Sequence, residues 1–132
     1  METLDDQTVA YVLATHAPFE DLKQVAAQLA GLLVLSEAGA KNASCDHPLL
    51  STAEQLHRSA VDLVRGARVT TRARMHHRHL LLAAAKLDQA LSSARAAGDP
   101  LTQLESAFAE LRSASRALPG FEMMSFERGC CA

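Results

Sequence analysis

The stretch "RVTTRARMHHRH" (residues 68–79) concentrates the side chains of this sequence that are best able to do chemistry. Within twelve positions it places four arginines and three histidines: Arg68, Arg72, Arg74, Arg78, His76, His77 and His79. Guanidinium groups bind carboxylates and phosphates, and neutral imidazoles bind transition metals. The stretch is therefore a candidate for a basic docking surface or a metal site, and its plainer interpretation is a solvated helix face.

The histidine spacing supports a metal only weakly. On a helix, His76 and His79 are three residues apart and can share a metal ion, whereas His76 and His77 point ~100° apart. A closed zinc site takes four nitrogen or sulfur ligands, and no third ligand follows at a supporting spacing. We therefore favour a basic surface formed by Arg68, Arg72, Arg74 and Arg78, which would dock an acidic protein partner or a phosphate-bearing ligand.

The distribution of charge explains why an acidic partner is considered. The chain has a net charge of −2, but residues 1–56 hold eight acidic and two basic side chains, and residues 57–95 hold eight basic and two acidic ones. Opposite charge in the two halves favours antiparallel docking, within one chain or between two copies. Nucleic acid is not expected as a partner, because the net charge is negative and no aromatic residues are interleaved with the arginines.

The ending "GCCA" carries a second chemical possibility. Neighbouring cysteines do not easily form a relaxed disulfide, but the thiolates of Cys130 and Cys131 can bind a soft or transition metal or exchange disulfides. The ending resembles the Cys-Cys tails with which mercuric reductases pass on metal ions. The resemblance covers three residues and implies thiol chemistry alone, since the glycine motif and CxxxxC of those enzymes are absent. A soft-metal or thiol-exchange protein, with His76 and His79 as further ligands, is the alternative function.

No pattern in the chain identifies an enzyme. Histidine phosphotransfer bundles follow their histidine with lysine and glycine, whereas Arg58 and Ser59 follow His57 here. Glu54 and His57 form one Glu-x-x-His pair, but a di-iron bundle needs two. We therefore expect no cofactor, apart from the possible metal ion, and a protein that acts by binding in an accessory, regulatory or assembly role.

Composition predicts an all-α protein. Of 132 residues, 48% are hydrophobic but only 4% are aromatic, so the core must consist of leucine, valine and alanine. We expect one domain over residues 1–120 and an apolar tail over residues 121–132. The acidic N-terminus does not resemble a signal peptide, and the longest apolar run, "AAQLAGLLVL", is too short to span a membrane. These features predict a cytoplasmic protein.

Two helices are expected before residue 40. The first begins at Thr3, a good N-cap, and has Asp5 and Asp6 in its first turn. Pro18 disfavours helix at the preceding residue, so the first helix should end there and a second should begin at Pro18. Gly39 should end this second helix.

A third helical segment runs from about Pro48 to Ala97. Its apolar stripe is rotated by about a third of a turn after the basic stretch, at ~100° per residue. Either the helix breaks or kinks near Gly66, or it is continuous and its two ends face different partners. We favour a long, bent helix of ~70 Å, whose length would require a dimer to cover it.

A last helix should follow the third segment. Gly98 ends the third segment, Asp99 and Pro100 begin the next helix, and Pro119 ends it. The complete prediction is an all-α, up-and-down bundle of four or five helices that forms a homodimer.

Overall fold

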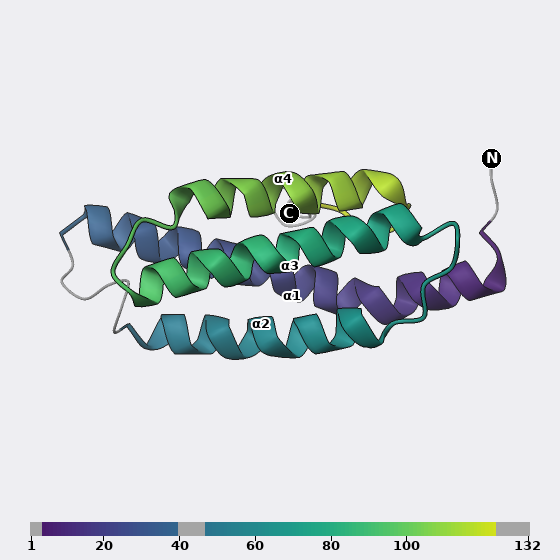
Figure 1. Ribbon diagram of the computed structural model, residues 1–132, viewed down its shortest axis with the longest axis horizontal. Coiled ribbons are helices and arrows are strands. Elements are labelled where there is room, and N and C mark those ends of the chain that lie inside the picture. Colours follow the sequence, from purple (N-terminus) through teal and green to yellow (C-terminus); the bar gives the residue numbers. More distant parts are fainter. Residues whose placement is uncertain (1–3, 40–46, 124–132) are drawn as a thin grey trace, which may run out of the picture.

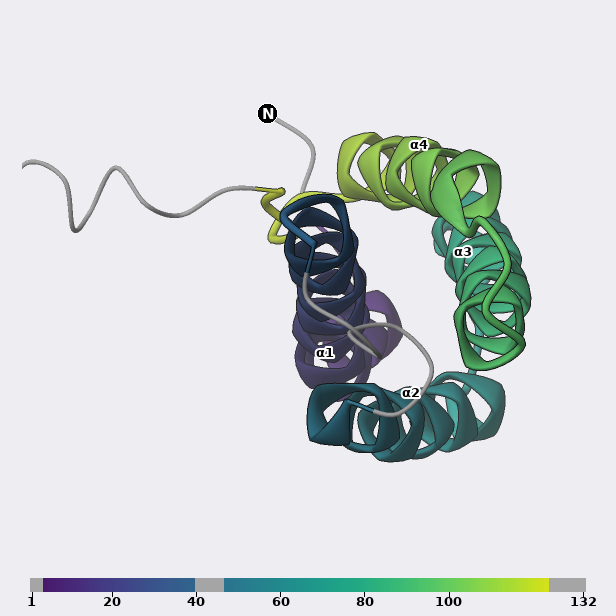
Figure 2. The ribbon, with the colours of Figure 1, turned by 90° about the vertical axis from the view of Figure 1, so that its left-hand side faces the viewer.

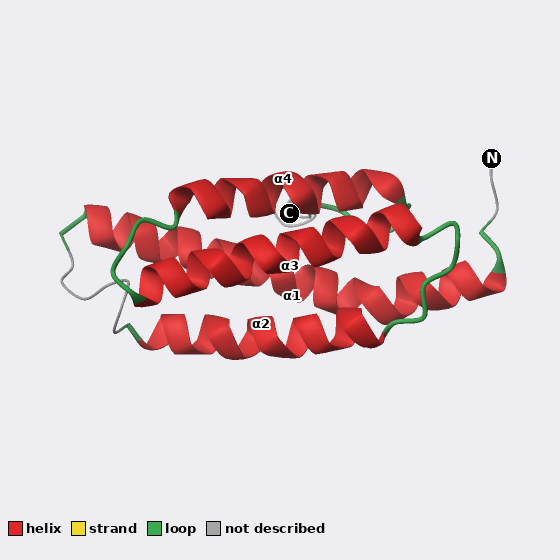
Figure 3. Cartoon of the chain, in the orientation of Figure 1, coloured by secondary structure: helices red, strands yellow, loops and turns green. Residues whose placement is uncertain are grey.

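The computed structural model describes residues 4–39 and 47–123, and every regular element in those ranges is helical. It contains α1 (Asp6–Glu37), α2 (Pro48–Gly66), α3 (Arg74–Arg95) and α4 (Leu101–Ala117), which run alternately up and down (Figures 1 and 3). Viewed from the end, the helices follow one another in chain order around a common core (Figure 2). The predicted all-α class is confirmed, with four helices in the described part of the chain.

The core is built from leucine and alanine, as the composition predicts. The closest pairs are α1 with α2 and α3 with α4, so that two helical hairpins face each other. Seven leucines are among the fully buried side chains: Leu22, Leu29, Leu32, Leu50, Leu80, Leu87 and Leu111. Buried alanines lie between them on all four helices, for example Ala26, Ala53, Ala83 and Ala107. Small side chains at these positions let the helix backbones approach closely.

The prediction of two helices before residue 40 is wrong, because α1 is continuous and contains Pro18. A proline inside a helix removes one backbone donor, which leaves the carbonyl of Ala14 without its usual partner. Ala14 is exposed, so water can bind this carbonyl, and Pro18 itself is buried against the bundle. The N-cap is Asp5 rather than Thr3, and its Oδ1 accepts from the backbone N–H of Thr8 at 2.6 Å.

The preference for one long third helix is also wrong, because residues 67–73 separate α2 from α3. Gly66 is a poor helix former, and Thr70 stabilises the turn that follows. The carbonyl and the hydroxyl of Thr70 both accept from the backbone N–H of Ala73. The Thr70 hydroxyl also forms a hydrogen bond of 2.9 Å with the hydroxyl of Thr8. The break accounts for the rotated apolar stripe, and it removes the overhang from which a dimer was predicted.

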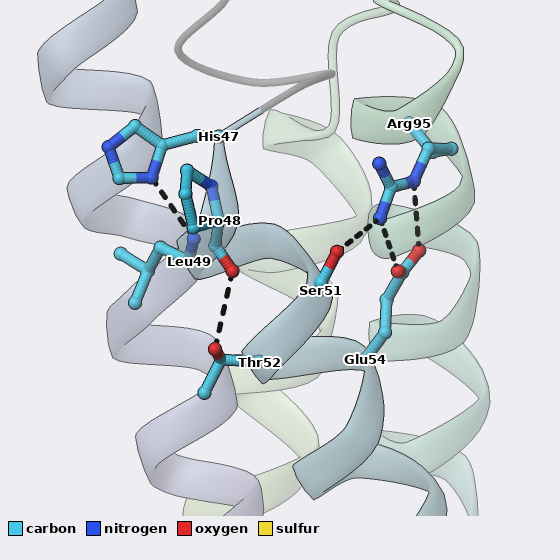
Figure 4. A network of polar contacts seen from close by, with 7 residues as sticks. All are labelled: His47, Pro48, Leu49, Ser51, Thr52, Glu54 and Arg95. Carbon is cyan, nitrogen blue, oxygen red and sulfur yellow. Dashed lines mark hydrogen bonds and ion pairs between the residues drawn. The ribbon is translucent and has the colours of Figure 1, made fainter.

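The start of α2 is tied to the end of α3 (Figure 4). His47 caps α2, its Nδ1 accepting from the backbone N–H of Leu49 at 3.1 Å. At this same end of the bundle, Arg95 donates from Nε to Glu54 at 3.3 Å and from Nη2 to Ser51 at 3.3 Å. This ion pair joins the acidic and basic parts of the sequence within one chain, as the charge distribution predicts.

After α4 the chain turns back onto α1. Gly120 has a φ of +97°, and a Cβ at this position would lie 3.4 Å from Cγ1 of Val12. Phe121 is then only 3% exposed. Residues 121–123 of the predicted apolar tail therefore pack on their own bundle, and the rest of that tail lies outside the described residues.

None of the four described helices is long and apolar enough to cross a membrane.

Candidate binding surface

The three histidines of the basic stretch contact three different helices. His76 is fully buried and shares a hydrogen bond of 2.8 Å between its Nδ1 and the hydroxyl of Tyr11 on α1. Its Nε2 has no hydrogen-bond partner among the described residues. Burial, followed by the charges of His77 and His79, lowers the pKa of His76 to about 4. His76 is therefore neutral at pH 7 and links α3 to α1.

His77 links α3 to α2. Its Nε2 donates to the carbonyl of Val64 at 3.0 Å, in the last turn of α2. A reciprocal bond starts from α2, where Nε2 of His57 donates to the carbonyl of Ala84 on α3 at 2.8 Å. Each helix of this seam thus contributes one imidazole that bonds to the backbone of the other.

His79 links α3 to α4. Its Nδ1 lies 2.7 Å from Oε1 of Glu110, and both side chains are about one-quarter exposed, at 24% and 26%. The predicted metal ligands His76 and His79 are thus bonded to side chains of α1 and α4, respectively.

The structure brings no larger metal-ligand set together in its described part. Within residues 4–39 and 47–123, no group of three or more histidine, cysteine, aspartate or glutamate side chains is placed to hold a metal ion. Cys130 and Cys131 lie outside the described residues, so the thiol alternative stays a prediction.

The arginines predicted as a binding surface lie at the turn between α2 and α3. Arg68 and Arg72 belong to the connection, Arg74 and Arg78 to the first turns of α3, and all four are exposed. Between Asp62 and Asp88 the sequence contains no acidic residue. The first turn of α3 also lacks an acidic side chain and a side-chain cap, so its positive helix dipole adds to the arginine charge.

A groove of about 400 Å³ lies in the seam between α2 and α3. Part of its lining is apolar: Val61, Leu81, Ala84 and Ala85. The charged side chains of the lining are Arg58, Asp62, Arg65 and Asp88. We call the groove, together with the exposed Arg68, Arg72, Arg74 and Arg78, the α2–α3 face.

Sequence reasoning left Arg58 and Arg65 out of the predicted surface and missed the groove. Arg58, Val61 and Arg65 follow one another at spacings of three and four, which places them on one side of α2. This spacing is visible in the sequence, but it indicates a groove only if a second helix runs alongside α2. The expected continuous third helix left no such neighbour.

Comparison of the chain with known protein families, with curated proteins and with solved structures finds no match in any of the three.

Proposed function

We propose that this protein acts by binding, and that its α2–α3 face docks an acidic segment of a partner protein. The observation that carries the proposal is the groove, in which apolar side chains lie beside Arg58 and Arg65. The exposed Arg78 precedes the lining residue Leu81 by three positions and so lies on the same side of α3. The α2–α3 face contains six arginines but only two acidic residues, Asp62 and Asp88, so its net charge is positive.

The chemistry of the face favours an acidic segment that also has apolar side chains. Val61, Leu81 and the alanines of α3 can cover one or two apolar side chains of a ligand, and burial of such groups supplies affinity. The arginines supply charge-assisted hydrogen bonds to carboxylates and exclude basic competitors. A phosphate-bearing ligand would use the arginines but leave the apolar lining unused.

Fluorescence anisotropy with a labelled peptide of leucine and glutamate tests this proposal. The double variant Arg74→Glu with Arg78→Glu reverses two exposed charges four residues apart on α3. Its matched control is Arg112→Glu with Arg116→Glu, which reverses two exposed charges at the same spacing on α4. We expect the α3 variant to weaken binding by about tenfold or more, since like charges at an interface cost over 1 kcal/mol, and the α4 control to bind normally.

Two further ligands separate the alternatives. A peptide of serine and glutamate, without leucine, should bind more weakly than the leucine peptide if the apolar lining contributes. Inorganic phosphate that binds as tightly as the leucine peptide would instead indicate a phosphate-bearing ligand. Equal weakening by the α3 and α4 variants would show that only net charge matters and would contradict the proposal.

We further propose that the protein is a homodimer, joined through the outer face of α1. Residues 7–19 contain no aspartate, glutamate, lysine or arginine, although this part of α1 is largely open to solvent. Leu13 is 73% exposed and Val9 40%, with the exposed small residues Ala10, Ala14 and Ala17 beside them. An uncharged apolar helix face can pack on its own copy without bringing like charges together.

Sedimentation equilibrium tests the dimer directly. We expect Leu13→Glu to convert the dimer into a monomer, because it would place a carboxylate in the interface of each copy. Leu101→Glu is the control, since Leu101 is also exposed but lies at the start of α4. A wild-type chain that stays monomeric at high concentration would rule out this interface.

A further inference from the structure

A second seam of the bundle, between α1 and α4, is occupied by the chain's own residues 120–123. In Figure 2 this segment reaches α1 on the side of the bundle away from the α2–α3 face. The segment contains no regular secondary structure. It is therefore held by side-chain packing and by hydrogen bonds to its main chain, and not by helix or sheet pairing.

Aromatic contacts hold the centre of the segment. The ring of Phe121 lies 3.9 Å from that of His76 and 5.2 Å from that of Phe19, measured between centroids. The ring planes of Phe121 and Phe19 meet at 75°, an edge-to-face arrangement that is favourable for aromatic pairs. Phe121 thus fills a socket of rings contributed by α1 and α3.

The main chain of the segment is bound by a lysine. Nζ of Lys23 on α1 donates to the carbonyls of Glu122 and Met123 and lies 5.2 Å from the centre of the Phe19 ring. Glu20 bonds the same Nζ at 2.8 Å and so orients it. Backbone carbonyls are common to all sequences, so this contact recognises a peptide main chain irrespective of its side chains.

The seam continues beyond the end of the described segment. A cavity of about 390 Å³ lies next to Met123, lined also by Gln24 and Ala27 of α1 and by Phe108 of α4. No described residue fills it. The seam can therefore hold a longer peptide than residues 120–123.

We propose that the seam between α1 and α4 is a peptide-binding site, which residues 120–123 occupy in cis and which a segment of a partner protein without helix or strand occupies in trans. The partner segment carries an aromatic side chain for the Phe121 socket, followed by two backbone carbonyls for Lys23. Its docking requires residues 120–123 to leave, so the chain regulates access to its own site. This proposal is independent of the α2–α3 face.

The test uses the full-length chain and a labelled synthetic peptide that copies residues 118–123. Phe121→Ala should empty the socket, and we expect this variant to bind the peptide about tenfold or more tightly than wild type, in which the tethered segment competes at millimolar effective concentration. Lys23→Met, added to Phe121→Ala, should reduce that binding. A peptide with alanine in place of its phenylalanine is the matched control and should not bind.

Circular dichroism establishes that each variant is folded. If Phe121→Ala is unfolded, Phe121→Leu takes its place; it keeps an apolar side chain but loses the ring contacts, so we expect a smaller gain in peptide binding over wild type. A folded variant that fails to bind the peptide would overturn the proposal and make residues 120–123 a fixed part of the fold. Arg74→Glu with Arg78→Glu should leave this binding unchanged, which separates the two sites.

Discussion

The loss of stability on acidification measures how far burial lowers the pKa of His76. Burial lowers the pKa of His76 to about 4, whereas an unfolded chain has the ordinary value of 6.5. Between these values the unfolded chain takes up a proton that the folded protein excludes. The free energy of unfolding therefore falls as the pH falls through this window, and the stabilisation is complete only above it.

The size of the effect follows from the two pKa values. At about pH 5 nearly every unfolded chain carries the proton on His76, but only about one folded molecule in ten does. This difference corresponds to a loss of about 2 kcal/mol in the free energy of unfolding relative to about pH 7.5. Full protonation below the folded pKa would raise the loss to about 3 kcal/mol.

Urea unfolding, followed by circular dichroism at both pH values, measures this loss. His76→Phe keeps a buried ring beside Phe121 but removes the titrating group, so its pH dependence should be smaller by about 2 kcal/mol. His16→Gln is the control, because His16 is exposed and its ring lies farther from that of Phe121, at 6.3 Å, than the ring of His76 does. If His76→Phe retains the full pH dependence of wild type, the imidazole does not lie in the environment described here.

Three further substitutions probe single contacts, each measured as the free energy of unfolding in urea. Tyr11→Phe removes the hydroxyl bonded to His76 and should cost about 1–2 kcal/mol, because it leaves a second buried nitrogen unpaired; an unchanged stability would show that this bond contributes nothing. Gly120→Ala should cost about 1 kcal/mol, since alanine is strained at a φ of +97°, and a stabilised variant would contradict the turn geometry. Arg95→Gln should cost under about 1 kcal/mol, because its pair with Glu54 is partly exposed; a much larger loss would mean that the pair is more strongly coupled than an exposed one.

The helix ends that carry a clear chemical signal could be predicted from the sequence. α1 ends at Glu37, just before the predicted Gly39, and α3 ends at Arg95, before Gly98. A Cβ at Gly98 would crowd the end of α3, since it would lie 2.9 Å from Oγ and 3.3 Å from the backbone oxygen of Ser93. The leucine and alanine core also follows from composition, since few other apolar side chains are present.

The two wrong helix boundaries have one physical cause. A local signal such as Pro18 or Gly66 changes the helix free energy by a few kcal/mol at most, and packing decides the outcome. Pro18 is tolerated because its ring is buried and the carbonyl that loses its helical partner belongs to the exposed Ala14. The break after Gly66 is stabilised by the bond between Thr8 and Thr70, residues 62 positions apart, which no local pattern reveals.

The roles of the histidines could not be predicted for the same reason. Their spacing predicts that His76, His77 and His79 point in different directions, and in the structure they bond to three different helices. The partners in those directions, Tyr11 and Glu110 among them, are contributed by helices distant in sequence. The exposure of the arginines, in contrast, could be predicted, because six basic residues and no acidic ones occupy positions 63–87.

The central claim is that the α2–α3 face binds an acidic, partly apolar segment, and amide chemical-shift mapping tests it most directly. Labelled protein is titrated with the leucine–glutamate peptide while its backbone resonances are followed. We predict shifts confined to the arginine turn and to the groove around Val61 and Ala85, with α1 and α4 unaffected away from this seam. Shifts that are absent, or that centre on α1 and α4, would contradict the account.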